Sequence, residues 1–220
     1  MNTAHNLRVV HDLDDPQQPA DTLIALQRGA DPADPTEHDT DVVDWRAETI
    51  ATQWEPESQL VGALMWLPAA CVRRILELVP DTAIWRPMNR WAYELIRSLV
   101  DDARDPDPVT VLARGKTQPA ADALQPHQPP TPERHKRLAL HLADLYTNTV
   151  TAAAAASYAR DVLDGAYRRA FREQGIRMQQ LGETATDRGD LTEQFTQIRD
   201  ELAELWRRCE AAAKPGWDTP

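Results

Sequence analysis

The chain has 220 residues, of which 42% are hydrophobic, and it contains only 8 glycines. This length supports one sizeable core or two small ones, and the helical periodicity of the apolar residues argues against a β-rich fold. The net charge of −11 argues against a domain that binds the phosphate backbone of a nucleic acid, because such binding needs a basic surface. We therefore expect an all-α protein that does not bind nucleic acid directly.

The first 55 residues form an acidic segment. They hold 12 Asp and Glu against 3 Arg and no Lys, which gives a charge of −9. Apart from one short helical pattern at DTLIALQRG, the segment has too few apolar residues to offset the entropy of ordering. The sequence therefore predicts a disordered acidic arm over residues 1–55. No secretory signal and no apolar stretch of membrane-spanning length is visible, so we expect a cytoplasmic protein.

Residues 56–150 are typical of a small bundle of helices. The apolar spacing predicts one helix over PESQLVGALMW and a second over about Ala69 to Val79. A loop region is predicted over residues 101–132, because the end of this segment, QPAADALQPHQPPTP, is too rich in proline for a helix or a sheet. A further helix is expected over about Pro132 to Tyr146, where Thr131 can cap the first turn.

The stretch IWRPMNRWAYELIRSLVDD predicts a corner followed by an amphipathic helix of this bundle. Pro87 fixes φ near the helical value and suits the first turn, where its missing N–H would be unpaired anyway. From Met88 to Leu99 the apolar residues recur at spacings of three and four, which places them on one face. We expect a buried corner made of Ile84, Trp85, Pro87 and Trp91, with Trp66 in the same core.

Residues 151–214 predict a long antiparallel helical hairpin, followed by a short tail over 215–220. Two apolar stripes of similar length, joined by the polar turn GETATDRGD, are what such a hairpin requires. A pair of helices has little core of its own, so we expect a second subunit or the preceding bundle to cover the apolar surface that the pair cannot bury. The pattern therefore predicts self-association, as a dimer or a higher oligomer, through Tyr167, Phe171, Met178, Leu191, Phe195, Ile198, Leu202, Leu205 and Trp206.

The sequence contains no catalytic, cofactor-binding or metal-binding motif that withstands inspection. RGKT, at residues 114–117, ends like a phosphate-binding loop. However, Thr110 stands where that loop needs a glycine, and Pro119 follows before a helix could begin. We therefore expect neither ATP binding nor enzymatic activity.

The histidines and cysteines give no metal-ligand pattern. His135 and His141 are six residues apart, on opposite faces of one predicted helix, whereas paired ligands need a shared face. Cys71 and Cys209 are far apart and lack metal-ligand spacing, so they are expected to be free thiols. No cofactor and no metal is predicted.

Taken in order, these segments resemble the N-terminal domain of the DnaB family of replicative helicases. PESQLVGALMW is similar to the family's opening helix, E-x-x-x-L-G-A-L, and IWRPMNRWAYELIRSL is similar to its F-Y-x-x-x-N/H-x-x-I-F-x-x-I corner. DPDPVTVLARG is similar to its P-V-D-x-V-T-V segment. LADLYTNTVTAAAAASYARDVLDGAYRRAFREQGIRM resembles the family's passage into a helical hairpin, and the resemblance covers about Pro56 to Cys209.

The resemblance implies a non-catalytic replication protein. Its implied roles are oligomerisation into a collar and docking of a replicative helicase, a primase or both. No part of the sequence resembles the family's RecA-like motor, so ATP hydrolysis by the family's mechanism is not expected. Two other interpretations stay open: an unrelated helical adapter or regulator whose acidic arm binds a basic partner, and an enzymatically dead remnant of a mobile element.

Overall fold

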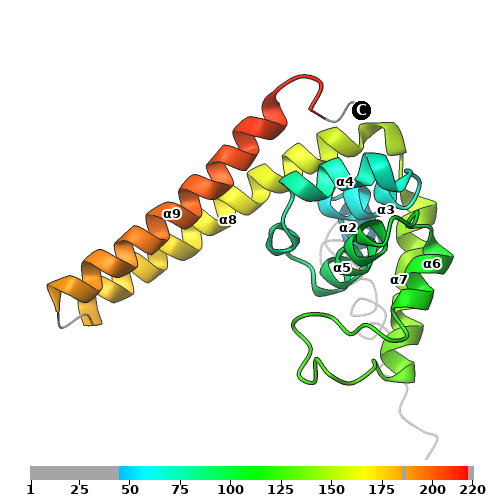
Figure 1. Cartoon of the computed structure of the whole chain (residues 1–220), viewed down its shortest axis with the longest axis horizontal. Coiled ribbons are helices and arrows are strands. Elements are labelled where there is room, and N and C mark those ends of the chain that lie inside the picture. The colour runs from blue at the N-terminus through cyan, green and yellow to red at the C-terminus, as the bar shows by residue number, and fades with distance from the viewer. Residues whose placement is uncertain (1–44, 185–186, 218–220) are drawn as a thin grey trace, which may run out of the picture. The chain divides into compact units, whose positions relative to one another are not determined.

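The structure, a computed structural model, describes residues 45–184 and 187–217. The chain divides into two compact units, Met1–Trp45 and Arg46–Pro220. The acidic arm lies outside the described residues as far as residue 44, and so does its DTLIALQRG segment. From Trp45 to Gln53 the chain forms helix α2 (Figure 1), so the prediction of disorder is wrong for these residues.

The second unit consists of helices, and residues 45–184 and 187–217 contain no strand, which confirms the predicted all-α class. Its helices are α3 (Pro56–Leu64), α4 (Ala69–Leu78), the 3-10 helix η1 (Asp81–Ala83), α5 (Pro87–Asp101), α6 (Pro108–Arg114), α7 (Pro132–Asn148), the 3-10 helix η2 (Ala152–Ala154), α8 (Ala155–Thr184) and α9 (Arg188–Ala213). The long helices α8 and α9 lie side by side, in yellow and orange in Figure 1. Within the described part of the chain, no helix is long and apolar enough to span a bilayer.

Helix α5 is the central helix of the bundle, and it packs against α3, α4, α6 and α7. It begins at Pro87, as predicted. The side chains of Trp91, Tyr93, Leu95 and Leu99 are all fully buried, and they point in several directions around the helix axis. A helix that is apolar on more than one face is typical of a core position.

The predicted loop over 101–132 contains a helix, α6, that the sequence pattern did not reveal. The carboxylate of Asp107 caps it by accepting the backbone N–H groups of Val109 at 2.8 Å and Thr110 at 3.1 Å. Pro108 occupies the first helical position. The cap and the proline are ordinary start signals, but a helix of 7 residues is too short to show a periodic apolar stripe.

Helices α3 and α7 approach each other closely at Gly62. A Cβ on this residue would lie 2.6 Å from the backbone oxygen of Leu145 and 2.0 Å from Oγ1 of Thr149. The Thr149 hydroxyl donates a hydrogen bond to the same Leu145 carbonyl at 2.7 Å. One of these two atoms, the Leu145 oxygen, belongs to the backbone of α7. A side chain at residue 62 would therefore require α7 itself to shift, because a backbone atom cannot rotate away as a side chain can.

We expect Gly62→Ala to destabilise the fold by about 2 kcal/mol, although alanine is the better helix former, because overpacking outweighs propensity here. Gly175→Ala is the matched control, since a Cβ there meets nothing within 4 Å. That change should stabilise α8 by roughly 0.5 to 1 kcal/mol. Urea unfolding of both variants makes the comparison, and a stabilising Gly62→Ala would contradict the close approach.

Candidate interaction surfaces

The corner at residues 84–91 is only partly the buried cluster that its apolar sequence predicts. Ile84 and Trp91 are fully buried, as expected. Pro87 begins α5 but is exposed. Trp85 is 59% exposed, so the prediction that it belongs to the core is wrong. Its ring lies at the surface beneath the guanidinium of Arg169 from α8, 5.7 Å from the ring centroid.

Trp66 was also expected in the core, but its side chain is 53% exposed. Its ring stacks on that of Tyr146, with 4.0 Å between the centroids and 6° between the planes. Trp66 follows the end of α3, and Trp85 precedes the start of α5. Outside a helix, helical spacing no longer decides which side of the chain a residue faces.

A buried polar cluster lies beneath the corner. The carboxylate of Glu57, from α3, accepts the backbone N–H groups of Trp85 and Arg86 at 2.8 Å each. The Asn89 side chain donates from Nδ2 to Glu57 Oε1 at 3.1 Å, and its Oδ1 lies 2.7 Å from Nε2 of His141. The cluster therefore joins α3, α5 and α7, and it places a carboxylate at the positive end of the α5 dipole.

We expect the stability of the fold to decline as the pH falls through the range in which free histidine gains a proton. Burial lowers the pKa of His141; Arg86 acts in the same direction and Asp144 opposes them. The unfolded chain, with a histidine pKa of about 6.5, therefore binds the proton more readily than the folded one. The contribution of neutral His141 to the free energy of unfolding is therefore fully present above about pH 6.5 and is lost as the pH falls below it. Urea unfolding from about pH 8 to about pH 5 measures the decline.

His141→Gln is the control for this pH dependence, because glutamine does not titrate and its amide can still donate a hydrogen bond to Asn89. The variant should lose less stability on acidification than the unmutated protein. An equal decline in both proteins would assign the pH dependence to other groups.

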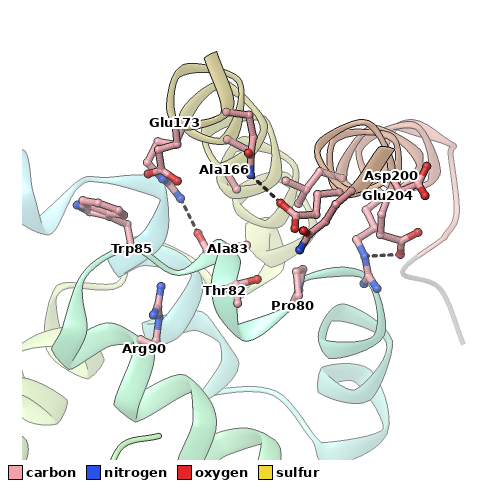
Figure 2. A pocket seen from close by; sticks show the side chains of 16 residues that line it. Pro80, Thr82, Ala83, Trp85, Arg90, Ala166, Glu173, Asp200 and Glu204 are labelled. Atoms are coloured by element: carbon pink, nitrogen blue, oxygen red, sulfur yellow. Dashed lines mark hydrogen bonds and ion pairs between the residues drawn. The ribbon is translucent and has the colours of Figure 1, made fainter. Parts of the chain in front are cut away.

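A cleft of about 810 Å³ opens between the helical hairpin and the segment that carries η1 (Figure 2). We call it the hairpin cleft. One wall runs from Pro80 to Trp85, and the other is formed by α8 and α9. In Figure 2, Ala166 and Glu173 lie on one hairpin helix and Asp200 and Glu204 on the other, across from the bundle wall.

Beside this cleft, two arginines of the hairpin helices donate hydrogen bonds to backbone carbonyls of the bundle. Arg169, from α8, donates a hydrogen bond to the carbonyl of Ala83 at 2.6 Å. Arg208, from α9, donates to the carbonyls of Glu77 and Leu78 at 3.0 Å each, at the end of α4. These carbonyls have no partner further along their own helix, so the arginine acts as a C-terminal cap.

The carboxylates of the cleft lie on the hairpin wall, and two of them are not neutralised. Within the described residues, no cation is in ion-pair distance of Glu173 or Glu201. Glu201 accepts a hydrogen bond from Nε2 of Gln174 at 2.6 Å. The other amide atom, Gln174 Oε1, is buried and has no partner in the described part of the chain.

The residues predicted to form the self-association interface do not all reach the surface. Ile198 is 1% exposed and lies inside the unit, where a second copy cannot contact it. Leu202 and Leu205 are half-buried, and Leu205 also lines the hairpin cleft. Tyr167 is half-buried and packs edge-on against Phe171, with 5.1 Å between the ring centroids.

The remaining predicted residues are exposed and form what we call the aromatic face: Phe171 (55%), Met178 (41%), Leu191 (36%), Phe195 (55%) and Trp206 (51%). At about 100° per residue, these residues share one side of their helices, and the cleft-lining residues of α8 and α9 fall on the opposite side. Ile176 is also exposed, at 54%, but points away from both. The hairpin therefore has two separate surfaces.

The RGKT segment does not have the geometry of a phosphate-binding loop. It follows a helix instead of preceding one, because α6 ends at Arg114. Lys116 is exposed, and Gly115 is buried so closely that a Cβ would lie 2.5 Å from the Leu138 side chain. The backbone there is packed against α7 and does not open around an anion.

The histidines of the described residues serve as hydrogen-bonding groups of the core, or lie in the loop before α7. Nε2 of His135 is 3.0 Å from the carbonyl oxygen of Leu112. The described residues contain no group of three side chains that could hold a metal ion. His5, His11 and His38 lie outside the described residues.

We expect no binding of ATP in the micromolar range, because the RGKT segment has neither a glycine-rich loop to surround the phosphates nor a helix that begins after it. Titration calorimetry with ATP and Mg²⁺ measures it. Micromolar binding that Lys116→Ala abolishes would contradict this expectation.

No protein-family model matches the chain, and no curated protein matches it. Among solved structures, the chain is similar to the N-terminal domain of DnaB helicase from Mycobacterium tuberculosis. The two are 23% identical, the match covers 72% of this chain and 93% of that chain, and the TM-score is 0.48.

Proposed function

We propose that the chain is a non-catalytic DNA-replication protein. In this proposal it is a module like the N-terminal domain of DnaB-family helicases, which assembles with itself and docks a replicative helicase, a primase or both. The observation that carries the proposal is the order of the segments that resemble this family. PESQLVGALMW contains α3, IWRPMNRWAYELIRSL forms the corner and most of α5, DPDPVTVLARG contains α6, and the hairpin follows.

Self-assembly is supported by the aromatic face of the hairpin. Five large apolar side chains are each at least 36% exposed there, along two adjacent helices. Several large apolar side chains exposed on one side of a helix pair are unusual for a monomer and are typical of an interaction surface. The proposed assembly is a two-fold dimer in which the aromatic face of one copy meets that of another.

The non-catalytic role is supported by what the candidate sites lack. The RGKT segment has the wrong geometry for phosphate, and the described residues hold no metal-ligand cluster. The proposed action is therefore to bind other replication proteins in the cytoplasm.

Two measurements test the proposal. Light scattering at roughly ten to a hundred micromolar should give a mass above that of one chain, since an interface of standard size gives micromolar affinity or better. Binding assays with the purified replicative helicase and primase of the same host should capture at least one of them. A clean monomer that captures neither protein would overturn the proposed function.

A further inference from the structure

We propose that the apex of the loop between α6 and α7 is a linear recognition element, which a partner protein binds through a groove lined by aromatic side chains. We call this segment the proline apex and define it as residues 124–130, LQPHQPP. The inference rests on the docking part of the proposed function and names the segment that docks. It does not depend on self-assembly.

The loop that carries the proline apex is longer than the connection requires. Helix α6 ends at Arg114 and α7 begins at Pro132, yet the two helices pack against each other. Gly115, directly after α6, already lies against the side chain of Leu138 from α7. Neighbouring helices of a bundle are usually joined by about 2 to 8 residues. In Figure 1 the connection is the long green loop that leaves the helices before α7, so most of it is not needed to join them.

The base of this loop is fixed to the bundle. The indole N–H of Trp91 donates a hydrogen bond to the carbonyl of Gln118 at 3.1 Å. The backbone N–H of Ala121 donates to the carboxylate of Glu94 at 2.9 Å. Ala120, between these two contacts, is 2% exposed. The chain therefore leaves the bundle at a defined point and presents the proline apex from there.

The proline apex itself makes no hydrogen bond or ion pair with another part of the chain that the structure describes. Its one backbone hydrogen bond is internal, from the N–H of Gln128 to the carbonyl of Gln125 at 3.2 Å. Leu124 is fully exposed, and Pro126 and Pro129 are exposed as well. These apolar side chains are available to a partner, and their removal from water would stabilise the complex.

The sequence restricts the end of the apex to the polyproline II conformation. The proline ring fixes φ at about −65° in Pro129 and Pro130. A proline also disfavours the helical region for the residue before it, which applies to Gln128, Pro129 and Thr131. Thr131 has φ −64° and ψ 153°, which are values of this conformation. A segment that is already restricted before binding loses little conformational entropy when a partner binds it.

These features specify the chemistry of the partner's groove. Residues 124–130 carry no Asp, Glu, Lys or Arg, so attraction to a charged surface does not explain docking. Proline rings and a leucine side chain pack well between aromatic rings. The carbonyls of Gln128, Pro129 and Pro130 accept no hydrogen bond within the described residues. The indole N–H of a tryptophan or the hydroxyl of a tyrosine in such a groove can donate to them.

The test measures how the full chain binds the purified replicative helicase and primase of the same host. Pro129→Ala combined with Pro130→Ala should weaken the binding of whichever protein is captured by about tenfold or more, because the groove loses two rings and a restricted backbone. Leu124→Ala should weaken it as well. Biolayer interferometry gives the dissociation constants. The melting temperature should change little, because these side chains lie outside the core.

Two exposed residues elsewhere provide matched controls. Pro215→Ala removes an exposed proline after the end of α9. Val109→Ala shortens an apolar side chain on α6 that is 76% exposed. Neither change should alter the binding. If the controls weakened it as much as the substitutions in the proline apex do, the effect would not belong to the apex and the inference would be overturned.

A synthetic peptide of residues 122–133 separates the segment from the rest of the loop. An excess of this peptide should displace the full chain from its partner, and a version carrying Pro129→Ala and Pro130→Ala should not. Undiminished binding by the doubly substituted chain, or a peptide that does not compete, would overturn the inference and leave the proposed function standing. If the unmutated chain captured neither helicase nor primase, the docking part of the proposed function would be wrong and this inference would fall with it.

Discussion

Glu57→Gln should lower the free energy of unfolding by about 3 kcal/mol, because each buried donor left without a partner costs about 1 to 3 kcal/mol. The Glu57 side chain is 8% exposed, and its two oxygens accept from Trp85 N, Arg86 N and Asn89 Nδ2. Glutamine keeps the shape but has one acceptor oxygen, and its NH₂ group would face other donors. Urea unfolding gives the free energy, and the midpoint should fall at an unchanged slope.

Glu55→Gln is the control for this prediction. Glu55 lies two residues away and pairs with Arg86 at 2.6 Å, but its side chain is 42% exposed. Solvent screens such a pair, so its loss should cost less than about 1 kcal/mol. If the two variants were equally stable, the corner would not depend on the buried carboxylate, and the cluster around Asn89 would be incidental to the fold.

The sequence predicted those parts of the fold whose causes are local. The starts of α5 and α7 were recognised from Pro87 and Pro132, since proline favours the first helical turn wherever that turn packs. Trp91, Leu95 and Leu99 were correctly placed in the core, because spacing within one helix determines a common face. Helix α6 had an equally local signal, Asp107 followed by Pro108, which could have been recognised without a periodic stripe.

The sequence could not reveal features that depend on contacts between distant residues. Glu57 lies 32 residues before Asn89, and Asn89 lies 52 residues before His141. A glutamate in the first turn of a helix is as compatible with an exposed position as with a buried one. The contacts of Trp85 are also with distant residues, since its backbone N–H donates to Glu57 and its ring lies beneath the guanidinium of Arg169.

For the candidate interface, the sequence likewise predicted the local pattern but not the burial of the individual residues. The spacing of α9 placed Phe195, Ile198 and Leu202 on a single apolar stripe, which is correct for the helix. The position of each residue within the stripe depends on how α8 lies against α9. That arrangement buries Ile198 and leaves Phe195 55% exposed. Two residues of one predicted stripe therefore differ, since one lies in the core and the other at the surface.

Phe195→Asp should therefore dissociate the self-assembled protein without unfolding it. In the isolated chain Phe195 is more than half exposed, so an aspartate there can remain hydrated and the hairpin should persist. In a two-fold assembly the same change places a carboxylate from each copy in an apolar seam, and an unpaired buried charge costs several kcal/mol. We expect the dissociation constant measured by light scattering to rise by about a hundredfold or more, with unchanged circular dichroism.

Two further substitutions on α9 distinguish this outcome from general damage. Ile198→Asp buries a carboxylate inside the unit, so it should lower the thermal stability of the monomer itself, whereas Phe195→Asp should not. Glu193→Lys changes an exposed residue outside the aromatic face and should leave both the mass and the stability unaltered. If Phe195→Asp left the assembly intact, the subunits would meet through another surface. If it melted the monomer as Ile198→Asp does, Phe195 would be part of the core of one chain and the aromatic face would have no role in assembly.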